Sequence, residues 1–374
     1  MALTRPVRTR TQYANQGLDR SSTEPLDLIT KVVGIYSTAP TSHLALIARL
    51  DGYQPSHLDK LLFEDRSLVR MGAMRGSGYL VPTKLVPTIV RATEGRRARV
   101  FTDLVGKLMD RTTYDRLATK IEKLLAGREM TTAEIRKEMK DKTFDKHLRY
   151  VVQLMTSECR LVTTRTSGTW RSNLTYNALW SDWLPKVDPW KAKPDKAKAD
   201  LAKLYFAAHG PATADDFAWW SGLRKDAAAG IERAQIPELG DGYFGPIDPA
   251  RPAKGVRLLP IWDSAFLTHK DRSHVVGDEW KRHVYDASGN PTSVVMVNGM
   301  AAGQWDLTIQ KSHHRVKVAP FKSFSEPTWK AVEKEVERLG LALDVPDIEV
   351  RRVKKAPSIA DAEWNRFMSP LKDL

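Results

Sequence analysis

The sequence predicts an α+β protein in which one unit, three helices followed by a β-hairpin, occurs three times in tandem before a small C-terminal β-barrel or sheet. Two observations favour the repeats. Apolar residues at helical spacing give way twice to short strands around a glycine turn, and two threonine caps open equivalent short helices. A third observation concerns the C-terminal part, where short β-rich segments alternate with glycine turns from about residue 255.

The first unit is expected over residues 23–112, after a basic N-terminal arm at 1–22. In the arm, four arginines either touch phosphates or are solvated: Arg5, Arg8, Arg10 and Arg20. Thr23 is a candidate helix cap, with Pro25 in the first turn. The helix stripe that follows consists of Leu26, Ile29, Val33 and Tyr36. Two further short helices are expected near residues 44–48 and 58–62, and the segments LVRMGAM and YLVP predict a hairpin around RGSG. This order is typical of a winged helix.

The second unit is expected over residues 113–185 and has the clearest pattern. Thr131 and Glu134 form a capping box, in which each side chain satisfies a free backbone N–H group of the other residue. Residues 144–158 predict a longer helix, and the turn at 166–168 separates two strands.

The third unit, at 199–254, follows a connector at 186–198 whose lysines and prolines predict exposed chain. Thr213 and Asp216 repeat the cap, and Phe217 and Trp220 are expected to face inward. Residues 255–356 are interpreted as a barrel-like β domain containing an amphipathic helix at 327–340, and residues 357–374 as a peripheral tail.

Composition limits the function classes. The chain has 374 residues, of which 42% are hydrophobic and 28% charged, as in ordinary globular proteins. Lys and Arg outnumber Asp and Glu by 59 to 45, so a polyanion is the first partner to consider. The single cysteine, Cys159, excludes an internal disulfide, and we interpret it as a packing residue. With no apolar run of about 18 residues, no membrane contact is expected, and the predicted location is the cytoplasm.

Several chemistries lack their motifs. The chain contains no phosphate-binding Walker loop, no GxGxxG after a strand and no GxSxG elbow. The nine histidines include no HExxH pair or other metal spacing. We therefore expect no flavin, nicotinamide or metal cofactor.

In a winged helix, the third helix enters the major groove and the hairpin meets the DNA backbone. Basic side chains of the first two units are therefore candidate DNA contacts. They are Arg66, Arg70 and Arg75 around the first hairpin, Lys146, His147 and Arg149 on the second recognition helix, and Arg165 and Arg171 beside its wing. Winged helices also serve as protein-interaction scaffolds, so that alternative remains open.

Three separated motifs carry a resemblance to a known family. The motifs are SLVRMGAMRGSGYLVP, GPATADDFAWWSGL, and RLLPIWDSAFLTHKDR with the following HVYDASGNPTSVVMVNGMAAGQWDL. They resemble the winged-helix DNA-binding superfamily that contains the bacterial AlkZ-like and YcaQ-like DNA glycosylases. The resemblance spans roughly residues 10–320. It implies three winged helices and a β-barrel that clasp duplex DNA, and excision of alkylated or crosslinked purines. The resemblance also draws attention to Asp263, Asp271 and Arg272. We interpret them first as structural polar links within the barrel. The second interpretation is DNA contact, for which Arg272 is the candidate.

The catalytic Gln-x-Gln or Gln-x-Asp motif of those glycosylases corresponds to Tyr36, Ser37 and Thr38, so neither glutamine is present. Tyr36 and Thr38 hydroxyls can orient a water molecule, but they do not match a carboxylate as a base. His43 is a further candidate base. The structural alternatives are that Tyr36 continues a helix stripe, that Thr38 caps a turn and that His43 is a surface histidine.

The leading hypothesis is a monofunctional DNA glycosylase acting on alkylated, bulky-adducted or crosslinked purines, with damaged double-stranded DNA as partner and no obligate protein partner. The alternative is a non-catalytic winged-helix DNA-binding protein that shields lesions or regulates transcription, because the glutamine motif is replaced.

Overall fold

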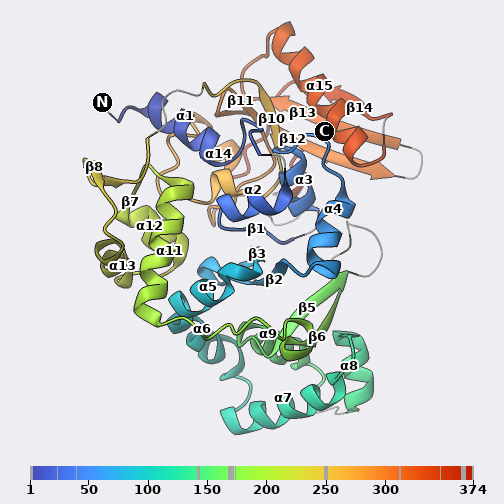
Figure 1. Ribbon diagram of the computed structural model, residues 1–374. Coiled ribbons are helices and arrows are strands. Elements are labelled where there is room, and N and C mark those ends of the chain that lie inside the picture. Colours follow the sequence, from blue (N-terminus) through green and yellow to red (C-terminus); the bar gives the residue numbers. More distant parts are fainter. Residues whose placement is uncertain are drawn as a thin grey trace.

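The computed structural model describes residues 3–22, 24–38, 40–140, 144–166, 172, 174–247, 252–310, 313–345, 347–363 and 368–372. The fold is α+β, as predicted. In Figure 1, a five-stranded sheet with α15 lies at one end of the molecule, and α7 and α8 lie at the other. The helices α11, α12 and α13 form one side, next to the first unit in the middle.

The first unit contains the predicted helices and hairpin. Its elements are α2 (Pro25–Lys31), β1 (Ile35–Tyr36), α3 (Thr41–Ile47), α4 (Pro55–Asp59), η1 (Lys60–Glu64), β2 (Leu68–Gly72), η2 (Met74–Gly76) and β3 (Gly78–Pro82). The predicted helix stripe through Tyr36 is wrong. Val33 and Gly34 both have positive φ angles, which end the helix, and Tyr36 then pairs with Tyr79 in a strand. Thr23 lies outside the described residues.

Short helices lead from this hairpin to the second unit: η3 (Thr83–Leu85), α5 (Val86–Ala92), α6 (Glu94–Val100) and η4 (Phe101–Val105). The second unit comprises α7 (Arg111–Leu125), β4 (Met130–Thr131), α8 (Thr132–Met139), α9 (Leu148–Ser157), β5 (Leu161–Thr166), β6 (Thr175–Leu179) and α10 (Trp180–Trp183). The capping box is confirmed, with the Thr131 N–H donating to Glu134 at 2.7 Å. The helix predicted from 144 begins only at Leu148. Cys159 is buried, as predicted for a packing residue.

The first two units share one six-stranded sheet, in the order β1-β3-β2-β5-β6-β4. The two hairpins join where Arg70 of β2 pairs with Thr163 of β5. The two units therefore form one continuous layer.

The third unit contains α11 (Pro194–His209), β7 (Ala212–Thr213), α12 (Ala214–Ser221), α13 (Asp226–Ala234), β8 (Glu238–Gly240) and β9 (Tyr243–Phe244). The second cap is confirmed, since the Thr213 N–H donates to Asp216 at 2.9 Å, and Phe217 and Trp220 are buried. The predicted exposed connector is wrong from residue 194 onward. Pro194 occupies the first turn of α11, where its missing N–H costs little, and the alanine Ala197 is fully buried.

The C-terminal region contains β10 (Val256–Leu259), η5 (Ser264–Phe266), η6 (Asp278–Trp280), α14 (Lys281–Val284), β11 (Val294–Val297), β12 (Met300–Gln310), β13 (His313–Pro320), α15 (Glu326–Ala342) and β14 (Glu349–Arg352). Its strands form an open sheet in the order β10-β11-β12-β13-β14, so of the two predicted forms the sheet is confirmed and the barrel is wrong for the described residues. The sheet does not need to close, because α15 packs Trp329 and Val332 into the same core as Trp305.

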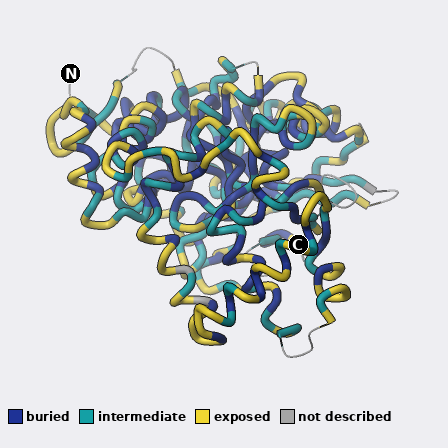
Figure 2. Tube along the Cα trace, turned by 60° about the horizontal axis from the view of Figure 1, so that its bottom comes forward, coloured by how far each residue is buried: buried dark blue, intermediate teal, exposed yellow. Residues whose placement is uncertain are grey.

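Both ends of the chain are integrated into the fold. The predicted arm instead forms α1 (Arg5–Asn15), in which Arg8 and Gln12 are buried. The predicted peripheral tail buries Leu371 completely, and the Lys317 ammonium donates to the Leu371 carbonyl at 2.8 Å. Figure 2 shows buried positions throughout the central layers of the molecule. Among the described helices, none is long and apolar enough to cross a membrane.

Candidate functional site

The turn between β2 and β3 packs against α12 of the third unit. Arg75 occupies this turn with a φ of 54°, and its guanidinium carbon lies 3.7 Å from the centre of the Trp219 ring. Gly222, which ends α12 with a φ of 76°, lies directly beside the Arg75 backbone. The first hairpin is therefore anchored to the third unit by a cation–π contact.

A second arginine reaches the same indole from the C-terminal region. The Arg272 guanidinium carbon lies 4.9 Å from the Trp219 ring centre and 4.3 Å from that of Tyr285. Its side chain donates to the Gly289 carbonyl at 2.9 Å and to the His269 carbonyl at 3.3 Å. These bonds hold the guanidinium in one position.

Tyr36 joins this group through β1. Its ring centre lies 4.7 Å from that of Tyr79, whose hydroxyl pKa is raised first by burial and then by the neighbouring Tyr36 hydroxyl. The pKa of Arg272 is lowered mainly by burial, with Tyr285 acting against this; Arg75 lowers it slightly and Tyr36 raises it slightly. The two arginines and Tyr36 therefore lie within electrostatic reach of one another.

We refer to these residues as the Trp219 cluster: Tyr36, Arg75, Tyr79, Trp219, Arg272 and Tyr285. Three of them were expected from sequence to act on DNA, and the fold brings these three together from distant parts of the chain. Sequence reasoning missed Trp219. The available signal was the pair AWWSGL, because residues adjacent on a helix face different directions and Trp220 was expected to be buried.

Thr38 and Ser37 continue the chain from the cluster into α3. The Ser37 N–H donates to the Gly78 carbonyl at 3.1 Å, and the Ser37 hydroxyl fills the space where Gly78 lacks a side chain. The Thr38 carbonyl accepts from the Ser42 N–H at 3.2 Å as α3 begins, and the Thr38 side chain is half-buried.

His43 is a core residue, so the expectation of a surface histidine is wrong. It is 5% exposed, and its Nδ1 lies 2.9 Å from the Tyr53 hydroxyl. Burial, with a smaller effect of Arg70, lowers its pKa to about 4. The ring is neutral at pH 7 and closed off from a macromolecular substrate.

Two of the predicted DNA contacts hold the fold together instead. Arg66 stacks 3.9 Å above the Trp183 ring and donates to the Trp183 carbonyl at 3.0 Å, linking the first two units. Arg70 lies at the junction of the two hairpins, where burial lowers its pKa.

The remaining candidates belong to the second unit. Lys146 and Arg149 are exposed at the start of α9, and His147 is half-buried. Arg165 is exposed at the end of β5, 4.1 Å above the Tyr176 ring and 3.3 Å from Glu129. Arg171 lies outside the described residues.

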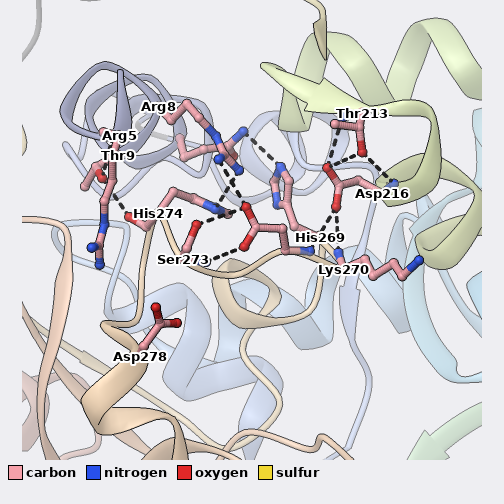
Figure 3. Close-up of polar contacts among 12 residues, drawn as sticks. Arg5, Arg8, Thr9, Thr213, Asp216, His269, Lys270, Ser273, His274 and Asp278 are labelled. Carbon is pink, nitrogen blue, oxygen red and sulfur yellow. Dashed lines mark hydrogen bonds and ion pairs between the residues drawn. The ribbon is translucent and has the colours of Figure 1, made fainter. Parts of the chain in front are cut away.

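Helix α1 contacts both the third unit, where the Asn15 amide donates to the Gly210 carbonyl at 2.9 Å, and the C-terminal region, which Arg8 reaches (Figure 3). Arg8 contacts Asp271 at 3.2 Å and the His274 ring at 3.4 Å, and Asp216 accepts the backbone N–H groups of Lys270 and Asp271. These contacts fix the loop that carries Arg272. The acidic residues are thus structural, as first expected, although they link separate regions and not strands of a barrel.

Asp263 makes the most buried of these links. Its carboxylate forms two bonds with Arg49, at 2.6 and 2.8 Å, and neither side chain is exposed to solvent. Arg49 also donates to the Gln16 carbonyl at 2.8 Å, so one side chain ties α3 to α1 and to the C-terminal region.

Comparison with known proteins identifies the family. Residues 29–341 match the family model described as DNA glycosylase AlkZ-like. The chain belongs to the AlkZ-like DNA glycosylase family. An interstrand DNA cross-link repair glycosylase of Streptomyces sahachiroi is 29% identical in an alignment of 177 positions, which covers 43% of this chain and 47% of that protein. The match thus spans about half the length of this curated relative.

The solved structure of Streptomyces sahachiroi DNA glycosylase AlkZ has the same fold. It superposes with a TM-score of 0.74 at 22% identity, covering 94% of this chain and all of that one. The AlkZ-like fold therefore extends over nearly the whole chain.

Proposed function

We propose that this protein is a monofunctional DNA glycosylase that hydrolyses the N-glycosidic bond of alkylated, bulky-adducted or crosslinked purines in double-stranded DNA. The Trp219 cluster carries the proposal. It joins Tyr36, at the position of the family's catalytic motif, to Arg75 of the β2–β3 turn, Trp219 of α12 and Arg272 of the C-terminal region. Arginines suit phosphates, and the half-buried indole holds both guanidiniums against its ring.

The proposed reaction uses the chemistry of the lesion. An N7-alkylated purine carries a positive charge, so the C1′–N9 bond breaks readily and its electron pair leaves with the base. Water adds to the oxocarbenium carbon and releases a proton to solvent. Tyr36 and Thr38 hydroxyls orient this water, which contributes through positioning and not through a strong base.

The finer architecture supports the same function. We infer three tandem winged helices, formed by α2–α4 with β2–β3, by α7–α9 with β5–β6, and by α11–α13 with β8–β9. The exposed residues Lys146, Arg149 and Arg165 are proposed to contact DNA phosphates, in addition to Arg75 and Arg272 of the cluster.

The test is excision from duplexes containing N7-methylguanine, a bulky N7 adduct or an interstrand crosslink, followed by alkaline cleavage of abasic sites. We expect abasic product on at least one substrate, and a loss on the order of 10²-fold in rate for the Tyr36→Phe/Thr38→Ala variant. Glu138→Gln, on the exposed face of α8, is the control. Product formed at the normal rate by the double variant would refute this reaction centre.

A second candidate function is non-catalytic DNA binding. The observation in its favour is the replacement of the family's glutamines by Tyr36, Ser37 and Thr38. It predicts tight, salt-sensitive binding to damaged duplex without abasic product on any of the three substrates. A protein-interaction scaffold would instead show no salt-sensitive binding.

A further inference from the structure

A pocket of about 350 Å³ lies between the β2–β3 turn, α6 and α9, outside the Trp219 cluster. The turn contributes Ala73 and Gly76, which lie on either side of Met74 and Arg75 in the sequence. Arg75 itself stacks on Trp219. Helices α6 and α9 contribute the arginines Arg96 and Arg149. We call this the hairpin–helix pocket.

The charge in this pocket is uncompensated. Its described lining includes three arginines and no carboxylate. Arg97 has a structural role, since it is buried and donates to the Gly72 and Ser157 carbonyls. Arg96 and Arg149 are exposed, and neither forms an ion pair within the described residues. Arg149 does contact Tyr150, since its guanidinium donates to the Tyr150 hydroxyl and lies 4.4 Å from the centre of that ring. Two exposed cations without an acidic partner therefore line the pocket.

Neutral hydrogen-bond donors line the walls. Thr132, Thr163 and Thr175 contribute hydroxyls, and Gln153 contributes an amide. Within the part of the chain that the structure describes, none of these four side chains forms a hydrogen bond to protein. Small residues at the turn allow a ligand to approach the backbone closely. Arginine and hydroxyl donors around glycine are the groups that proteins use to bind phosphate oxygens.

The surroundings add more positive charge. The pKa of Arg96 is lowered first by burial and then by Arg99, Arg224 and Arg75, with Asp103 opposing them. Arg96 thus lies among cations from α6, from Arg224 in the segment between α12 and α13, and from the β2–β3 turn. An anion bound here would relieve their mutual repulsion.

We propose that the hairpin–helix pocket binds a backbone phosphate of the DNA, as a subsite separate from the reaction centre. This inference rests on the proposed function in taking DNA as the ligand. A pocket lined by arginines, hydroxyls and an amide is poorly suited to an apolar small molecule. Because the turn of Arg75 borders both the pocket and the cluster, a phosphate held here would help to set the position of the strand at Trp219.

The test compares two variants that lose the same charge. Arg96→Ala/Arg149→Ala removes the two exposed arginines of the pocket, whereas Arg116→Ala/Lys120→Ala removes two exposed cations from α7. Binding to an undamaged duplex is measured by fluorescence anisotropy across a range of NaCl concentrations. We expect the pocket variant to bind roughly tenfold more weakly, with a salt slope smaller by about 1 to 2, and the α7 variant to bind like wild type.

Equal behaviour of the two variants would overturn the proposal. Thr163→Val provides a second test that leaves the charge unchanged and keeps the volume similar, and it should also weaken binding. Titration with inorganic phosphate at constant ionic strength distinguishes the source of the phosphate. Stabilisation by phosphate with unchanged DNA affinity in the pocket variant would refute a DNA subsite. Since undamaged duplex is used, the result does not depend on whether the protein excises bases.

Discussion

The buried Arg49–Asp263 pair gives a sharp prediction about what holds the C-terminal region to the first unit. Asp263→Asn keeps the side-chain shape and the acceptor for the Ala265 N–H, which lies 2.9 Å from Asp263 Oδ1, but removes the charge. The Arg49 cation would then remain fully buried without its counter-ion. Breaking a buried pair in this way costs about 3–5 kcal/mol in free energy of unfolding.

The expected change in melting temperature follows from chain length. An unfolding entropy of about 2 cal/mol/K per residue makes the loss equivalent to about 4–6 °C. Differential scanning calorimetry of Asp263→Asn measures this shift. The matched control is Glu138→Gln, which breaks a pair with Arg128 of similar length, 2.7 Å, whose side chains are 51% and 39% exposed. The control should cost less than about 1 kcal/mol.

The outcome separates burial from mere pairing. If Asp263→Asn lowers the melting temperature no more than Glu138→Gln does, desolvation of Arg49 is not the controlling factor. The double variant Arg49→Met/Asp263→Leu removes both charges and should recover most of the loss, because no unpaired charge then remains in the interior.

Three further predictions concern the site and its supports. Trp219→Ala should remove the ring shared by the two arginines and lower excision at least tenfold in single-turnover assays; an unchanged rate would exclude the indole from the site. Burial keeps the pKa of His209, His269 and His274 below its ordinary value, so these rings take up protons on unfolding below pH 6.5. The contribution of these neutral rings to the free energy of unfolding should be complete above that pH and fall toward pH 4. The loss is about 1.4 kcal/mol per pH unit for each ring that stays neutral in the folded protein. Urea titrations at pH 7 and pH 5 would detect it as a lower midpoint at pH 5. Burial raises the pKa of Cys159 to about 11, so the thiol of the native protein should react slowly with a disulfide reagent. Unfolding the protein should expose this thiol, and the reagent should then label one cysteine per chain.

Features determined by a few neighbouring residues could be predicted from the sequence. The caps at Thr131 and Thr213 bond as expected, because a capping box needs only residues three apart. The β2–β3 hairpin and the helix at 327–340 were also found, since alternation around glycine and an amphipathic stripe are local patterns.

The errors arise where tertiary contacts override local patterns. Apolar spacing continues through Tyr36, but Gly34 allows the chain to turn so that Tyr36 adds to an existing strand. The basic N-terminal segment was expected either to touch phosphates or to be solvated, yet its Arg8 pairs with Asp271, more than 260 residues away in the sequence. Local composition carries no information about a partner at that distance.

The same reasoning explains why the candidate site was only partly visible from sequence. Each basic residue was a plausible phosphate contact by composition, but the fold assigns them different roles. Arg66 stacks on the Trp183 ring, whereas Arg75 and Arg272 both contact the Trp219 ring. The neighbouring aromatic ring distinguishes these roles. Trp183 forms an internal link between the first two units, whereas Trp219 is half-buried where three regions of the chain meet. The proposed reaction, in which Tyr36 and Thr38 stand in place of the family's glutamines, would depend on such placement, because water positioned beside a reactive cationic lesion needs a rigid frame more than it needs a strong base.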